Sequence, residues 1–406
     1  MFSLQLDLDR PNKVASQASD HVLRVRIQPQ ANSTATLPLH LAIVLDTSSS
    51  MRGEKLQQAK VACESVVNQL RPQDRLSLAS FSTRVAPLLQ GAQGGDTRAA
   101  TAAIDRLTAE GVTRTDLALD WLRQALPAAP RIARVAILIT DGHATNAQGR
   151  VLEDFNFLIE QAGQLAEAGI VLCTVGLGNA ANFNTGFLVS LSDRGGGAFL
   201  YADMPANLET QLQERLAASQ AIAIEAVQLR LQPLNGATLE GFCQFRPEYL
   251  PLEETVQNQV TLTNLRTDSP TDVLVQLSVP ALEFGQSLGS RETLALQLSG
   301  SGFSPLSAKV SITDTNSYST AQQVHEEVDR DRLMWEINLD STELTRTTDP
   351  NRTGELLVNL QVNGIKSGNP HIAEKAAQQL NKLKETGQLD AHKTTGLLRD
   401  TRKLGA

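Results

Sequence analysis

Oxygen-bearing side chains follow two strongly apolar stretches of this sequence. Residues 39–45 are almost entirely apolar and lead directly into Asp46, Ser48 and Ser50. Residues 135–139 form a second apolar stretch, which leads through Thr140 into Asp141. Carboxylate and hydroxyl oxygens are hard ligands of the kind that Mg²⁺ prefers in proteins. We therefore expect a divalent-cation site if the fold brings the ends of these two stretches together.

The elements around these residues predict a fold that does so. From residue 39 to about residue 201, short apolar runs alternate with helical patterns, which is typical of a mostly parallel sheet with helices on both faces. An unbroken apolar run such as 39–45 is expected for a central strand that is covered on both sides. In doubly wound α/β folds, ligands bind at the carboxyl ends of the strands. Asp46 and Asp141 should then lie on the same edge of the sheet.

The pattern changes after about residue 220, where apolar residues recur at every second position. Val273, Val275 and Leu277 show this alternation, and residues 23–27 show it before the α/β region begins. We therefore expect an antiparallel β-sandwich into which the α/β domain is inserted. The predicted parts are N-terminal strands at 1–36, the α/β domain at 37–220, the sandwich at 221–328 and a mainly helical segment at 329–406.

The ordered ligand pattern resembles the von Willebrand factor type A (VWA) family over about residues 39–219. The metal-ion-dependent adhesion site of that family has an Asp-x-Ser-x-Ser motif, a Thr in a later loop and an Asp after a buried strand. The matching residues here are Asp46, Ser48, Ser50, Thr113 and Asp141. Met51, Gly53 and Lys55 follow the first motif as they commonly do in the family. Ser49 and Val112 stand where glycine is frequent, which implies slightly stiffer loops without loss of a ligand.

The resemblance implies that the hydroxyls of Ser48, Ser50 and Thr113 bind Mg²⁺ or Mn²⁺ directly. Asp46 and Asp141 would act mainly through water or hydrogen bonds. Neutral hydroxyl ligands leave a divalent ion electrophilic, so an Asp or Glu of a partner protein can complete its coordination. Thr47 and Thr115 are secondary candidates for ligands. Arg114, Asp116 and His143 flank the site and are expected at its rim.

These expectations predict a non-enzymatic, metal-dependent protein-binding module that serves in adhesion or as a scaffold. The resemblance adds an AAA+ ATPase or a signalling assembly as classes of partner. The alternative is a metal-dependent phosphohydrolase that uses the same ion. That alternative is weaker because the sequence offers no obvious general base beyond His143 and no phosphate clamp.

The composition and net charge argue against several other classes of protein. The 406 residues are 41% hydrophobic and 20% charged, which is ordinary for packed domains. The net charge of -8 gives no sequence-wide electrostatic footprint for nucleic acid or an anionic membrane.

No apolar stretch approaches the roughly 18 residues of a membrane span, and the N-terminus lacks a signal-peptide pattern. Cys63, Cys173 and Cys243 have no Cys-x-x-Cys spacing, so we expect buried free thiols in a soluble, cytoplasmic protein.

Two further motifs match enzyme patterns only superficially. Gly176, Gly178 and Ala181 satisfy the dinucleotide fingerprint Gly-x-Gly-x-x-Ala, but that fingerprint belongs at the first strand of its fold. Residues 285–289 match the Gly-x-Ser-x-Gly nucleophile elbow, which requires a helix to follow. The alternation after residue 290 instead predicts a strand, so neither motif is expected to function.

Overall fold

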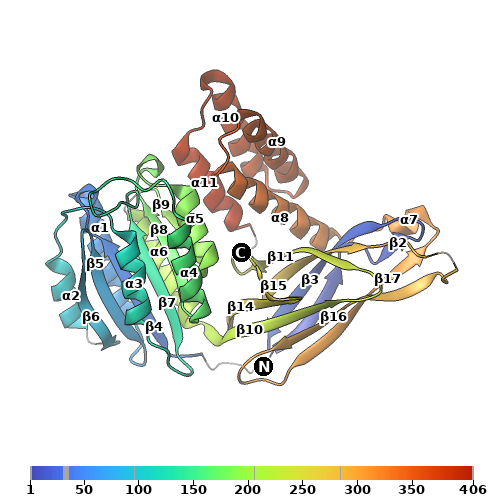
Figure 1. Cartoon of the computed structure of the whole chain (residues 1–406), viewed down its shortest axis with the longest axis horizontal. Coiled ribbons are helices and arrows are strands. Elements are labelled where there is room, and N and C mark those ends of the chain that lie inside the picture. The colour runs from blue at the N-terminus through green and yellow to red at the C-terminus, as the bar shows by residue number, and fades with distance from the viewer. Residues whose placement is uncertain (1, 31–35, 96, 205, 284, 405–406) are drawn as a thin grey trace.

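The computed structural model describes residues 2–30, 36–95, 97–204, 206–283 and 285–404. The chain forms three parts: an α/β domain, a two-sheet β-sandwich and a C-terminal bundle of helices (Figure 1). The bundle lies beside both of the other parts. This architecture confirms the predicted fold class, an α/β domain inserted in an antiparallel sandwich and followed by helices.

The α/β domain is built on a six-stranded sheet with the order β6-β5-β4-β7-β8-β9, in which only β6 is antiparallel to its neighbour. Its strands are β4 (Leu39–Asp46), β5 (Arg75–Phe81), β6 (Val85–Gln93), β7 (Ala133–Thr140), β8 (Val171–Leu177) and β9 (Gly196–Ala202). All eight residues of β4 are buried, as expected for a central strand that is covered on both faces.

Six helices cover this sheet. Those on one face are α1 (Glu54–Gln69), α2 (Thr97–Asp105) and α6 (Ala206–Gln220), and those on the other are α3 (Thr115–Ala125), α4 (Asn156–Glu167) and α5 (Thr185–Arg194). The β4 side chains alternate between the two resulting cores: Leu41 and Ile43 pack on the first, and Ala42 and Val44 on the second. This double cover explains why the sequence shows a continuous apolar run rather than alternation.

The sandwich combines strands from both sides of the α/β domain. One sheet has the order β1-β3-β15-β11-β12 and the other β13-β14-β10-β16-β17-β2. The N-terminal strands are β1 (Phe2–Leu8), β2 (Asn12–Val14) and β3 (Ser19–Pro29). The later strands are β10 (Ile222–Pro233), β11 (Thr238–Arg246), β12 (Leu250–Pro251), β13 (Glu254–Val256), β14 (Gln259–Arg266), β15 (Thr271–Val279), β16 (Gly289–Ser299) and β17 (Leu306–Thr315).

Strand β3 pairs with β15 in antiparallel register, with Val25 opposite Val273 and Leu23 opposite Val275. These side chains are fully buried between the two sheets. The core of the sandwich therefore requires strands that lie before and after the α/β domain in the sequence.

The two connections to the α/β domain run side by side. The Leu37 amide donates a hydrogen bond to the Ile222 carbonyl at 2.8 Å. The Arg71 guanidinium donates to the carbonyls of Leu37 and Gln220, and the buried Asp74 carboxylate holds that guanidinium in place. Arg71 thus joins the chain entering the domain to the chain leaving it.

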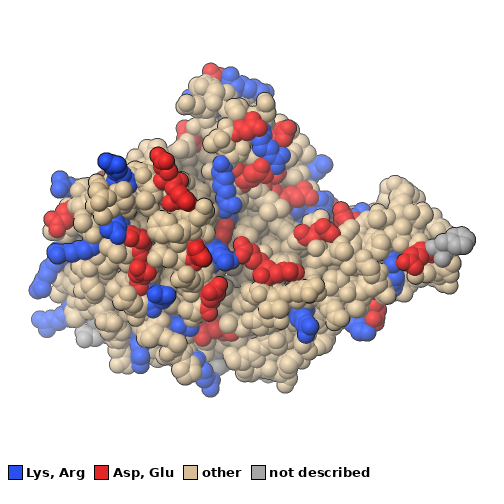
Figure 2. Space-filling model, viewed as in Figure 1, with Lys and Arg blue, Asp and Glu red and all other residues tan. Residues whose placement is uncertain are grey.

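The helices after the sandwich are α7 (Tyr318–Ala321), α8 (Glu326–Leu344), α9 (Pro350–Lys366), α10 (Pro370–Thr386) and α11 (Ala391–Arg402). Helix α8 is fixed to the sandwich by Asp331, which accepts hydrogen bonds from Arg24 of β3 and Arg246 of β11. Helix α11 contacts the α/β domain at β9. Figure 2 shows acidic and basic side chains interspersed over the face in view.

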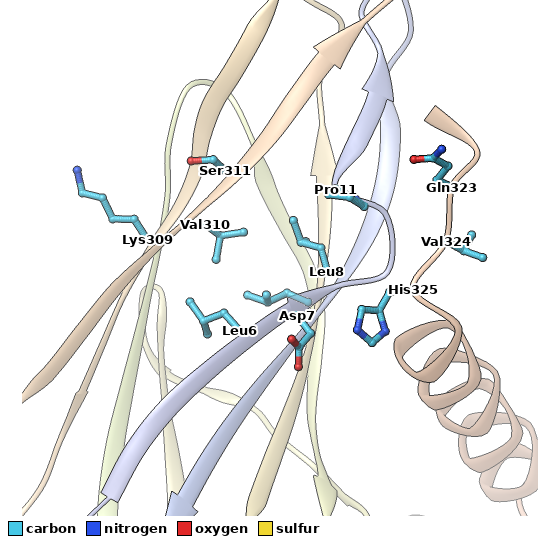
Figure 3. A pocket seen from close by; sticks show the side chains of 11 residues that line it. Leu6, Asp7, Leu8, Pro11, Lys309, Val310, Ser311, Gln323, Val324 and His325 are labelled. Atoms are coloured by element: carbon cyan, nitrogen blue, oxygen red, sulfur yellow. The ribbon is translucent and has the colours of Figure 1, made fainter. Parts of the chain in front are cut away.

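A hollow of about 550 Å³ lies on the sandwich between β1, β17 and the segment that precedes α8 (Figure 3). Its lining mixes apolar side chains, such as Leu6 and Val310, with Asp7 and His325. It lies on the sandwich, whereas the predicted cation ligands belong to the α/β domain (Figure 1).

Candidate metal site

Strands β4 and β7 are parallel neighbours, with Leu45 opposite Ile139. Asp46 is the last residue of β4, and Asp141 directly follows the last residue of β7. Parallel pairing in this register brings both carboxylates to one edge of the sheet, as the sequence predicted.

The Asp46 side chain is fully buried and accepts two hydrogen bonds. Its Oδ1 accepts from the Ser48 backbone amide at 2.7 Å, and its Oδ2 accepts from the Thr140 hydroxyl at 2.6 Å. Burial raises the pKa of Asp46 to about 6 although these hydrogen bonds favour the charged form, and the nearby Asp141 carboxylate adds to the rise. The raised pKa means that the buried charge of Asp46 is poorly compensated by the protein alone, so a cation beside it would stabilise the carboxylate.

The Ser50 hydroxyl of the first motif binds Asp141, and the Ser48 hydroxyl lies beside it. The Ser48 and Ser50 Oγ atoms are 3.0 Å apart, and the Ser50 hydroxyl donates to Asp141 Oδ1 at 2.7 Å. Neighbouring ligands of an octahedral ion with bonds of roughly 2.0–2.1 Å are about 2.9 Å apart. The spacing of these three oxygens is therefore close to that of adjacent ligands of Mg²⁺.

Thr113 reaches the same place from a different loop. A Cβ atom built on Gly142 would lie 3.4 Å from Ser50 Oγ and 3.5 Å from Thr113 Oγ1, so both hydroxyls border the open side of Gly142. The Thr113 amide donates to the Thr145 hydroxyl at 3.0 Å, and the Thr145 amide donates to the Thr113 carbonyl at 2.8 Å. Thr145 thus fixes the Thr113 backbone beside the loop that carries Asp141.

Ser49 and Val112, the two departures from the family motif, lie in the first motif and in the loop before Thr113. The Ser49 hydroxyl and amide both donate to the Gly111 carbonyl at 3.1 Å, which ties the first motif to the loop before Thr113. Gly111 has φ +83°, and a Cβ there would lie only 2.4 Å from Thr83 Oγ1. The glycine that this loop requires is therefore at residue 111, directly before Val112.

Two contacts in the site were not assigned from the sequence. Thr140 was noted only as the residue before Asp141, yet its hydroxyl binds Asp46. Lys55 was noted only for its resemblance to the family, yet its ammonium forms an ion pair with Asp141 Oδ2. A polar residue that ends a buried strand, and a lysine in the first turn of the following helix, were the available signals.

Among the rim residues named from the sequence, Thr47, Arg114 and Asp116 have side-chain partners outside this set. The Thr47 hydroxyl donates to the Phe81 carbonyl at 3.2 Å, and Thr115 is buried at the start of α3. Arg114 and Asp116 form a two-bond ion pair at 2.8 and 2.6 Å. His143 is partly exposed in the loop after Asp141.

The donor set fits a hard cation. Within the described ranges, no group of three or more His, Cys, Asp or Glu side chains could hold a metal ion. The oxygens gathered here come instead from three hydroxyls and two carboxylates, and the side-chain-free face of Gly142 leaves space beside two of the hydroxyls. When bound, a divalent ion would supply a positive centre with room for an anionic ligand.

The enzyme-like motifs have packing explanations. A Cβ on Gly176 would lie 2.6 Å from the Phe183 ring, so this glycine admits the aromatic side chain. Gly178 has φ +83° and lies under the Lys55 side chain. Gly289, the last residue of the elbow pattern, begins strand β16 rather than a helix. The three cysteines are free and buried, as predicted.

Comparison with known proteins identifies the inserted domain. The family model for the von Willebrand factor type A domain matches residues 40–214, so this part of the chain is a VWA domain. The uncharacterized protein sll0103 of Synechocystis is 29% identical over 68% of this chain and 66% of its own length. Inter-alpha-trypsin inhibitor heavy chain H3 of Mesocricetus auratus is 27% identical over 43% of this chain, but this match spans only 20% of the heavy chain.

Solved structures share the complete architecture. A von Willebrand factor type A protein from Catenulispora acidiphila superposes with a TM-score of 0.80 at 17% identity and covers 99% of this chain and 96% of its own. The ArnB paralog VWA2 from Sulfolobus acidocaldarius gives a TM-score of 0.60 at 16% identity, with 100% and 99% covered. At these identities the likeness shows the fold alone. No helix in the described part of the chain is long and apolar enough to cross a membrane.

Proposed function

We propose that this protein is a metal-dependent protein-binding module that captures a carboxylate of its partner. VWA domains typically bind protein partners and are usually non-catalytic. In the proposal, Ser48, Ser50 and Thr113 hold Mg²⁺ or Mn²⁺ directly, and Asp46 and Asp141 orient the ligands and balance the charge. An Asp or Glu of the partner supplies the remaining ligand.

The observation that carries the proposal is the meeting of hydroxyls from two separate loops around Gly142, next to a carboxylate. Ser50 Oγ and Thr113 Oγ1 both border Gly142, and Asp141 Oδ1 is 2.7 Å from Ser50 Oγ. Hydroxyls contribute no negative charge, so a divalent ion held mainly by them keeps a strong attraction for an external carboxylate. A site with this property is suited to binding an acidic group reversibly.

The test is a pull-down from lysate with the full chain in Mg²⁺, Mn²⁺, Ca²⁺ or EDTA. Partner capture should occur in Mg²⁺ and Mn²⁺, be lost in EDTA and be weak in Ca²⁺, which prefers more ligands at longer distances. Asp141→Ala should abolish capture. The matched control is Asp268→Ala, which removes a carboxylate of the sandwich that is 46% exposed. Equal capture in EDTA would contradict the proposal.

A metal-dependent phosphohydrolase is the alternative use of the same ion. The charged groups at the rim do not favour it, because Arg114 is already paired with Asp116 and would have to leave that pair to bind phosphate. Hydrolysis of p-nitrophenyl phosphate in Mg²⁺, lost in the Ser48→Ala Ser50→Ala double variant, would establish the enzyme instead.

The class of partner and the cellular setting are also proposals. An AAA+ ATPase or a signalling assembly remains the expected partner, and the cytoplasm remains the expected location. The three unpaired, buried cysteines are compatible with a reducing compartment. Mass spectrometry of the captured partner would test both expectations.

A further inference from the structure

We propose that Lys55 is a built-in counter-cation of the adhesion site, which weakens the binding of the metal ion alone and strengthens the capture of a carboxylate by the metal-loaded site. This inference rests on the proposed function, because it concerns how the same site couples its two ligands. It assigns a role to a residue that is neither a metal ligand nor part of the partner-binding rim.

The geometry of α1 directs Lys55 to the site. Gly53, with φ +84°, turns the chain, and α1 begins at Glu54. Lys55 therefore lies in the first turn of the helix, and its ammonium reaches Asp141 Oδ2. The opposite oxygen of the same carboxylate, Oδ1, accepts from Ser50. Asp141 is thus shared between the ammonium and a proposed metal ligand.

The Lys55 side chain runs past Gly178, which has no side chain of its own. Its Cε lies 3.4 Å from the position that a Cβ would take on Gly178, where φ is +83°. Most of the Lys55 side chain is shielded, with 25% of its surface exposed, and the Asp141 carboxylate is fully buried. An ion pair with one fully buried partner is screened far less by water than an ion pair on the surface.

The formal charges of the site explain the proposed coupling. With Asp46 and Asp141 ionised, Lys55 leaves the metal-free site with a single net negative charge. A divalent ion then makes the site singly positive, and a partner carboxylate makes it neutral. Without Lys55 the same steps would run from two negative charges to neutral and then to one negative charge. Lys55 therefore opposes the first step and favours the second.

A neutral side chain of similar length at residue 55 should change the two affinities in opposite directions. In Lys55→Met the ion meets no competing cation at Asp141, so Mn²⁺ should bind about tenfold more tightly. The loaded site loses its net positive charge, so a carboxylate should bind about tenfold more weakly. Couplings of roughly 5- to 150-fold are usual between linked ligands. A residue with only a structural role would weaken both affinities together.

The first measurement is calorimetric titration of the full chain with Mn²⁺ at pH 8 and constant ionic strength. Lys55→Met should show the tighter binding, and Lys55→Arg, which keeps the charge, should stay near wild type. Lys60→Met is the matched control, because Lys60 is on the same helix but binds the Asp105 carbonyl at 2.8 Å instead. It should leave the affinity for Mn²⁺ unchanged.

The second measurement uses acetate as the carboxylate probe, with chloride at the same ionic strength as its control. The Mn²⁺ titrations are repeated in both salts, and the gain in affinity due to acetate reports the coupling. Wild type should show a clear gain, and Lys55→Met a smaller one. Lys55→Gln serves as a second neutral variant, and thermal unfolding of each protein confirms that the variants compared are folded.

The outcomes separate this inference from the function on which it rests. If wild type binds Mn²⁺ and gains affinity from acetate while both neutral variants match it, the adhesion site stands and the role of Lys55 is wrong. Weaker Mn²⁺ binding in both neutral variants would likewise overturn it and indicate that Lys55 merely positions Asp141. If wild type binds no Mn²⁺, the proposed function itself fails.

Discussion

The Tyr201 hydroxyl and His392 Nδ1 lie 2.6 Å apart, although the two residues belong to β9 of the VWA domain and α11 of the C-terminal bundle. At the other end of α11, the Arg402 guanidinium makes two hydrogen bonds to the Asp193 carboxylate on α5, at 2.6 and 2.9 Å. Tyr201 lies near the carboxyl end of β9, the end of the sheet that also carries Asp46. Helix α11 therefore runs along the VWA domain, from the carboxyl end of β9, on the sheet edge that carries Asp46, to the C-terminal end of α5 just before β9 begins.

Asp193→Asn should destabilise the protein by about 3 kcal/mol, because it leaves the buried Arg402 guanidinium without its charged partner. Urea unfolding measures the change. Lys403→Met is the control: its contact with Glu214 is 3.8 Å long and well exposed on both sides, so its loss should cost less than about 0.5 kcal/mol. Equal stabilities for the two variants would show that α11 is not held by the Asp193 pair.

Replacing Ser48 and Ser50 together with alanine should abolish Mn²⁺ binding and leave the VWA fold intact. Both changes remove hydroxyls at the end of β4 and delete no apolar core atoms. Calorimetry measures the affinity, and circular dichroism the fold. Ser49→Ala is the matched control, because the Ser49 hydroxyl binds the Gly111 carbonyl instead of facing Ser48 and Ser50. Mn²⁺ binding that survives in the double variant would place the ion elsewhere.

Thr113→Ala should reduce capture of the partner far more than it reduces Mn²⁺ affinity. Thr113 belongs to a loop that is remote in sequence from Ser48 and Ser50, so its contact with an ion is the one most able to change when a carboxylate binds. Pull-downs and Mn²⁺ titrations on the same samples compare the two effects. Thr145→Ser is a useful control, because it keeps the hydroxyl that fixes the Thr113 backbone. An equal loss of both activities would argue against a switching role.

A fragment of residues 36–220 should fold alone, because its sheet is covered on both faces by its own helices. Deletion of residues 1–30, in contrast, should unfold the sandwich, since it removes the buried Leu23, Val25 and Ile27. Their burial alone accounts for roughly 5 kcal/mol or more. Scanning calorimetry should show the VWA transition retained and the sandwich transition lost. Matching profiles for the full-length and truncated proteins would contradict this prediction.

Acidification from pH 7 to pH 5 should lower the free energy of unfolding partly through His40. Burial among positive neighbours lowers the pKa of His40 to about 4 from the usual 6.5, so the unfolded chain takes up a proton in this range and the folded protein does not. After allowance for solvent screening the loss is about 1 kcal/mol. His40→Gln, which can still bind Ser77, should lose less stability over this range in urea titrations at both pH values. Parallel pH dependence in the two proteins would exclude His40 as the cause.

The sheet of the VWA domain and the position of Asp46 and Asp141 at one of its edges could be predicted because both depend on local patterns. The continuous apolar run before Asp46 specified a strand covered on both faces, and the residues after it specified its carboxyl end. The alternation at Leu23, Val25 and Ile27 likewise predicted their pairing with strands that lie beyond the inserted domain, which β15 provides.

The contacts that join separate parts of the chain could not be predicted in this way. Arg24 donates a hydrogen bond to Asp331, which lies 307 residues further along the chain. Nothing in the sequence near either residue indicates this partner. The ion pair of Lys55 with Asp141 depends on the direction in which α1 leaves Gly53 and on the space above Gly178. Both depend on three-dimensional placement, which residue types and spacing do not encode locally.

The pairing of β3 with β15 also dictates an order of events during synthesis. A ribosome releases β3 long before β15, and at roughly 5–20 residues per second the delay is about 10–50 seconds. The VWA domain lies wholly between these strands and contains every strand of its own sheet. It can complete its core while the first strands of the sandwich still lack their partner, so the nascent chain must keep β1 and β3 from aggregating until β15 emerges.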